Sequence, residues 1–62
     1  METTIYSLRT ATGHITVKVP VKQMEIFSEI RDQYPEDREA FSEAKKMYIE
    51  KYPEEARAFY GD

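Results

Sequence analysis

The sequence predicts an α+β fold in which one β-hairpin precedes two amphipathic helices and a short C-terminal helix. Apolar residues alternate with polar ones before Pro20, as in a half-buried strand, and recur every three or four residues after it, as on one face of a helix. Pro35 and Pro53 then divide the second part into segments of helical length. We expect all 62 residues to form one small domain.

Two strand-like segments, residues 3–10 and 14–19, make up a hairpin that we expect over residues 3–19. Both segments are rich in threonine, isoleucine, valine and tyrosine, which favour strands. Gly13 lies between them and allows the positive φ that tight hairpin turns need. One face of the ribbon is expected to be apolar and to consist of Tyr6, Leu8, Ile15, Val17 and Val19.

The register of the hairpin can be predicted from parity. Residues that face each other across two strands must lie on the same side of the ribbon, so an even-numbered apolar residue must pair with an odd-numbered one. A two-residue loop of Thr12 and Gly13 satisfies this condition and pairs Leu8 with Val17.

Three helices are expected after the hairpin, over about residues 21–34, 36–51 and 54–60. Each of the last two begins at a proline followed by acidic residues, a combination suited to the first turn of a helix. Gly61 is expected to end the third helix. The apolar stripe of the second helix is predicted to consist of Ala40, Phe41, Ala44, Met47, Tyr48 and Tyr52.

Composition limits how so short a chain can be stabilised and where it can work. A chain of this size buries only about 60% of the surface that it exposes when unfolded, so its stability is marginal. There is no cysteine, and His14 is the only histidine, which excludes a disulfide and a zinc site of Cys and His ligands. We therefore predict no metal or cofactor, and regard a homodimer as one source of added stability. The polar, acidic start and the lack of a long apolar run favour a cytoplasmic protein without membrane contact.

No pattern of residues indicates an enzyme. Nucleophilic catalysis needs a nucleophile beside a base, and His14 is expected in an exposed turn. The two glycines are too few for a phosphate-binding loop, and the carboxylates fall at helix starts and on outer faces.

Protein binding is the function that the sequence favours. The net charge is −3, and residues 24–62 hold eleven of the twelve acidic side chains. Apolar and aromatic residues gather near the C-terminus, where they either cap the core or form a contact surface of the kind that aromatic residues favour. We predict an adaptor, inhibitor or regulator, such as a phage or mobile-element accessory protein, that acts through an acidic and aromatic helical surface. The predicted contact residues are Ile49, Tyr52, Phe59 and Tyr60.

A dimeric DNA-binding transcriptional regulator is the alternative. A two-stranded ribbon with basic and hydroxyl side chains on one face can enter a major groove, and Arg9, Thr16 and Lys18 would make the contacts. Nucleic acid is the less favoured partner because two cations are few for binding phosphates.

Overall fold

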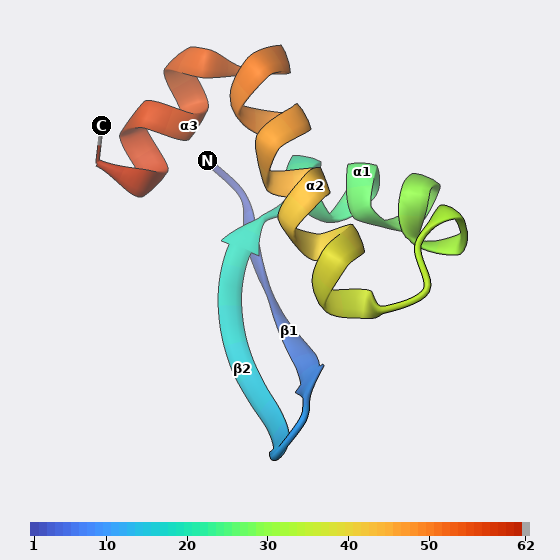
Figure 1. Ribbon diagram of the computed structural model, residues 1–62. Coiled ribbons are helices and arrows are strands. Elements are labelled where there is room, and N and C mark those ends of the chain that lie inside the picture. The colour runs from blue at the N-terminus through green and yellow to red at the C-terminus, as the bar shows by residue number, and fades with distance from the viewer. Residues whose placement is uncertain (62) are drawn as a thin grey trace.

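The structure is a computed structural model that describes residues 1–61 (Figure 1). It confirms the predicted α+β class, because an antiparallel two-stranded hairpin is followed by three α-helices. The elements, in chain order, are β1 (Thr3–Thr10), β2 (Gly13–Pro20), α1 (Val21–Ile30), the 3-10 turn η1 (Arg31–Gln33), α2 (Asp37–Lys51) and α3 (Pro53–Tyr60).

The hairpin and the helices meet along only part of the ribbon. Helix α2 packs on α1 and also lies against β1, while α1 approaches β2. The turn of the hairpin extends away from the helices, and α3 lies at the opposite end of the molecule (Figure 1). The two ends of the molecule therefore offer separate surfaces.

The hairpin loop differs from the prediction by one residue. Thr10 pairs with Gly13, so the loop is Ala11 and Thr12, and Leu8 faces Ile15. Gly13 still has a positive φ of 140°, but as the first residue of β2. Among the described residues only glycines have a positive φ, so this loop cannot use the turns that require it at the first central position. The expected face pattern survives because the pairing moved by two, and side chains alternate with a period of two.

The first helix ends earlier than expected. We predicted a helix to residue 34, but α1 stops at Ile30, one 3-10 turn follows, and Tyr34 is extended with φ −121° and ψ 141°. Pro35 accounts for the extended Tyr34, because its ring disfavours helical backbone at the preceding residue. At the other end of the chain, Gly61 closes α3 with φ 87°, as predicted.

Three aromatic rings join the ribbon to the helices. Tyr6 of β1 lies 5.2 Å from Phe27 of α1 and 6.0 Å from Phe41 of α2, and Phe27 and Phe41 are 5.7 Å apart, measured between ring centroids. Ala40 and Ala44 are fully buried, and their small side chains allow α1 to approach α2 closely.

Two residues expected in the core are exposed. Ile15 lies near the turn of the hairpin, beyond the helices, and is 49% exposed. Met47 is 43% exposed because it lies at the margin of the buried stripe of α2, about 60° from Ala44 by helix geometry. Both positions satisfy the periodicity of their element, but neither has a neighbouring element to cover it.

Candidate functional site

The predicted contact residues lie in the last turn of α2, at the junction of α2 with α3, and at the end of α3, and we call them together the aromatic end. They are Ile49, Tyr52, Phe59 and Tyr60. Ile49 is 42% exposed and Tyr60 is 37% exposed, whereas Tyr52 and Phe59 are partly buried. The residues thus combine some capping of the core with some exposed apolar surface.

Tyr60 is held against α2 by a lysine. The Nζ atom of Lys45 lies 4.4 Å from the centroid of the Tyr60 ring, and the ring of Phe59 lies edge-on at 4.9 Å from the same centroid. Ile49 follows Lys45 by one helical turn, so the two share one flank of α2. The structure therefore brings the C-terminus of α3 to the flank of α2 that carries Ile49.

Tyr52 has a different set of neighbours. Its ring packs on that of Tyr48 at 5.7 Å, and Lys22 of α1 and Lys51 place their Nζ atoms 4.6 Å and 5.7 Å from its centroid. Lys22 also forms an ion pair with Glu55 at 2.8 Å, and its hydrogen bond to this carboxylate raises the pKa of Lys22. Tyr52 thus lies at the edge of the core, where α1, α2 and α3 meet.

The charges around these rings differ from the expected acidic surface. Lysines contact both tyrosines, and within residues 1–61 no carboxylate lies within ion-pair distance of Lys45 or Lys51. Glu43 lies on the far flank of α2, about 160° around the helix from Lys45, where it pairs with Lys46 at 3.4 Å. The aromatic end is therefore bordered by Lys45, by Lys51 and by the Lys22–Glu55 ion pair, and part of the acidic surface lies elsewhere.

A buried polar cluster anchors Tyr60 from beneath, and the sequence reasoning missed it. Gln23 is fully buried, and its Oε1 accepts a hydrogen bond from the hydroxyl of Tyr60. Within the described part of the chain, Gln23 Nε2 and the Tyr48 hydroxyl have no hydrogen-bond partner. Periodicity contained the signal, because Gln23 precedes the buried Ile26 and Phe27 by one turn on the same stripe.

Replacing Tyr48 by phenylalanine is expected to stabilise the fold by about 1 kcal/mol, because it removes a buried hydroxyl that has no partner. Burial also raises the pKa of Tyr48, so the native state resists ionisation of this group more than the unfolded state does. Native stability should therefore fall as the pH rises above about 10, and less steeply in Tyr48→Phe. Urea unfolding at pH 7 and above pH 10 measures both effects. A loss of stability at pH 7 would show that the hydroxyl is satisfied.

The predicted nucleic-acid residues are all exposed on the outer face of the ribbon. Arg9 pairs with His14, and Thr16 pairs with Ser7 across the two strands. Lys18 faces the 70% exposed Ile5. The structure thus brings Arg9, Thr16 and Lys18 onto one open face, as expected from their parity.

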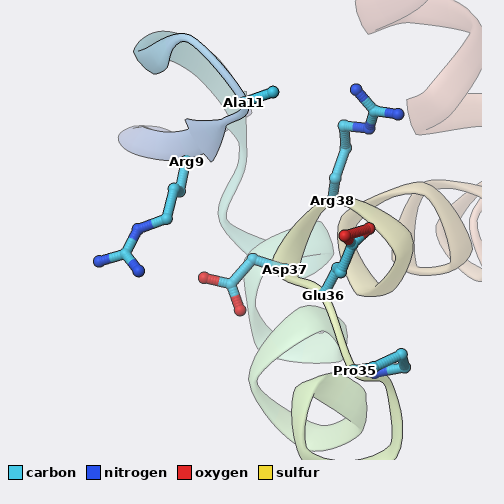
Figure 2. Close-up of a pocket in the computed structure, with 6 residues that line it drawn as sticks. All are labelled: Arg9, Ala11, Pro35, Glu36, Asp37 and Arg38. Carbon is cyan, nitrogen blue, oxygen red and sulfur yellow. The ribbon is translucent and has the colours of Figure 1, made fainter.

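Arg9 also borders a hollow of about 380 Å³ between the ribbon and the start of α2 (Figure 2). Figure 2 shows Arg9 and Arg38 pointing in different directions there, with Asp37 between them. Asp37 forms an ion pair with Arg31 at 3.7 Å. The hollow is lined by charges of both signs whose side chains do not point toward a common centre, so it indicates no particular ligand. Its walls are formed by Arg9, Ala11, Pro35, Glu36, Asp37 and Arg38.

A second hollow, of about 580 Å³, lies beside the start of α1. Lys22 and Glu55 on its wall already pair with each other. Residues 1–61 contain no group of three or more His, Cys, Asp or Glu side chains placed to hold a metal ion. Within the same residues, no helix combines the length and the apolar character that crossing a membrane requires.

Comparison of the chain with family models, with curated proteins and with solved structures finds no match.

Proposed function

We propose that this protein is a non-enzymatic protein-binding module and that its aromatic end is the contact surface. The observation that carries this proposal is the pairing of an exposed isoleucine with an exposed tyrosine from another helix. Ile49 and Tyr60 are 42% and 37% exposed. Lys45 contacts the Tyr60 ring and lies one helical turn before Ile49, so both residues lie along the same flank of α2. Large apolar and aromatic side chains of this kind form the energetic centre of protein interfaces.

The way Tyr60 is held supports a binding role. Its ring lies under Lys45, and its hydroxyl donates to the buried Gln23. A ring already fixed in one orientation loses little side-chain entropy when a partner covers it, so more of the contact energy is available for binding. Lys45 and Lys51 at the rim favour a partner with carboxylates around an apolar centre.

The test compares two lysine substitutions on opposite sides of α2. Ile49→Lys is expected to leave the fold intact and to weaken partner binding at least tenfold, or about 1.4 kcal/mol, because it places a charge in the apolar contact. Met47→Lys is the matched control, since Met47 has almost the same exposure, 43%, but lies about 160° around the helix. It should change the affinity by less than about twofold.

The partner would first be captured from the host with the wild-type chain and then purified for calorimetric titration, with circular dichroism checking each variant's fold. Equal losses in both variants would mean that the aromatic end is not the contact surface. Unfolding of Ile49→Lys would place Ile49 in the core and refute the site.

DNA binding by the ribbon is the second candidate. It is favoured by the exposure of Arg9, Thr16 and Lys18 on one face, with no helix covering them. We place it second because only two of these residues carry full charge. Binding to a random duplex that weakens steeply as salt rises from about 50 mM would support it. No change in fluorescence anisotropy even at that low salt would remove it.

A further inference from the structure

The outer edge of β2 has no strand beside it within residues 1–61. The sheet has two strands, so β2 has a strand neighbour on one side only. Helix α2 lies against β1, and the far side of β2 faces open space (Figure 1). Unpaired strand edges of this kind readily accept a further strand.

The middle of β2 confirms that this edge is uncovered. His14, Ile15, Thr16 and Lys18 are exposed, and Val17 is partly buried. Within residues 1–61, none of these five residues takes part in a backbone hydrogen bond with a turn, a loop or a helix cap. In an antiparallel pair every second residue directs its N–H and C=O away from the partner, so this stretch offers outward-pointing donors and acceptors.

The pattern of polar and apolar side chains along this edge is the same when it is followed in either direction. From His14 to Lys18 the order is polar, apolar, hydroxyl, apolar, polar, with Thr16 at the centre. Ile15 and Val17 share the face of the ribbon that bears the helices, and His14, Thr16 and Lys18 share the outer face. A strand that reads alike in both directions complements its own copy when the two run antiparallel, which is the requirement of a two-fold symmetric interface.

We propose that a second copy of this chain pairs antiparallel with the outer edge of β2, with the two-fold axis at Thr16, to form a four-stranded sheet. Ile15 then lies opposite the partner's Val17, and by symmetry Val17 lies opposite the partner's Ile15. Ile15 is 49% exposed because no element of its own chain covers it, and this contact reduces that exposure.

Charge is compatible with this register and disfavours the register centred on Lys18. With Thr16 at the axis, Lys18 faces the partner's His14, and no two lysines are opposed. Centring the pair on Lys18 would oppose two like charges, and centring it on Ile15 would place Val17 against the partner's Gly13. A three- or four-stranded sheet is also more stable than an isolated hairpin, which is marginal in water. This inference concerns a different surface from the aromatic end and does not depend on the proposed function.

The first test is the oligomeric state of the full chain. Sedimentation equilibrium over a wide range of concentrations should show a monomer–dimer equilibrium. Ile15→Lys should weaken dimerisation at least tenfold, because each lysine would meet an apolar residue of the partner. Ile49→Lys is the control, since Ile49 is 42% exposed and lies on α2 rather than on the ribbon, and its dimer constant should change by less than about twofold.

A cross-link tests the register. In a pair centred on Thr16 the two Thr16 Cα atoms lie about 4.5–5.5 Å apart, which suits a disulfide. Thr16→Cys should therefore give a disulfide-linked dimer under mild oxidation. Ser7→Cys should not, although Ser7 is the β1 neighbour of Thr16 and is equally exposed. The chain has no cysteine of its own to interfere.

A monomer at every concentration, or a dimer that Ile15→Lys leaves unchanged, would overturn the proposal. Equal cross-linking of the two cysteine variants would overturn the register. Dimerisation that Ile49→Lys abolishes and Ile15→Lys does not would move the interface to the aromatic end.

Discussion

Replacement of Phe27 by alanine is expected to unfold most of the protein at room temperature. Phe27 is 1% exposed and contacts both Tyr6 and Phe41, so its ring joins the ribbon to both long helices. Truncating a buried phenylalanine costs about 3–5 kcal/mol. Without disulfides or metals a domain of this size rarely has more than about 3–5 kcal/mol of stability in total. The loss is therefore comparable to the whole free energy of unfolding.

Urea unfolding followed by circular dichroism measures this effect. Ser28→Ala is the control, because Ser28 is the exposed neighbour of Phe27 in the same helix and should change the stability by less than about 0.5 kcal/mol. A loss of less than about 1 kcal/mol in Phe27→Ala would mean that the ribbon and the helices do not share this core.

The second large effect is expected from filling the space between α1 and α2. Ala44 is fully buried where these helices pack, and a leucine there must displace its neighbours or push the helices apart. Overpacking of a core costs about 1–3 kcal/mol, which is a large share of the stability of so small a domain. We expect Ala44→Leu to lower the urea midpoint accordingly.

The matched variant is Ser42→Leu, on the exposed side of the same helix. It should shift the midpoint little, because no neighbour opposes the new side chain. Equal midpoints for the two variants would indicate that α1 and α2 have room between them, contrary to the packing described above.

The two proposed surfaces do not compete. The aromatic end lies on α2 and α3, and the uncovered stretch of β2 lies toward the hairpin turn, at the other end of the molecule (Figure 1). A dimer formed through β2 would leave both copies of the aromatic end accessible. Such a dimer presents two binding sites, and a partner that is itself multivalent would gain affinity from this arrangement.

The order and type of the elements could be predicted because they depend on local patterns. The alternation before Pro20 and the helical period after it determine where strands give way to helices. Pro53 is the first residue of α3 because proline favours a first turn, whereas Pro35 lies two residues before α2 and separates it from the preceding segment. Gly61 ends α3 because glycine adopts the required φ of 87° at no cost. Each of these effects acts within a few residues.

Burial, and with it the candidate site, was decided by the tertiary structure. Leu8 and Ile15 face each other on the apolar side of the ribbon, yet one is 6% exposed and the other 49%. Gln23 is fully buried because α3 brings Tyr60 to it from 37 residues away, and Lys45 lies over the same ring for the same reason. Periodicity tells which face of an element is apolar, but how far a neighbouring element covers that face depends on lengths and angles set by packing between distant segments.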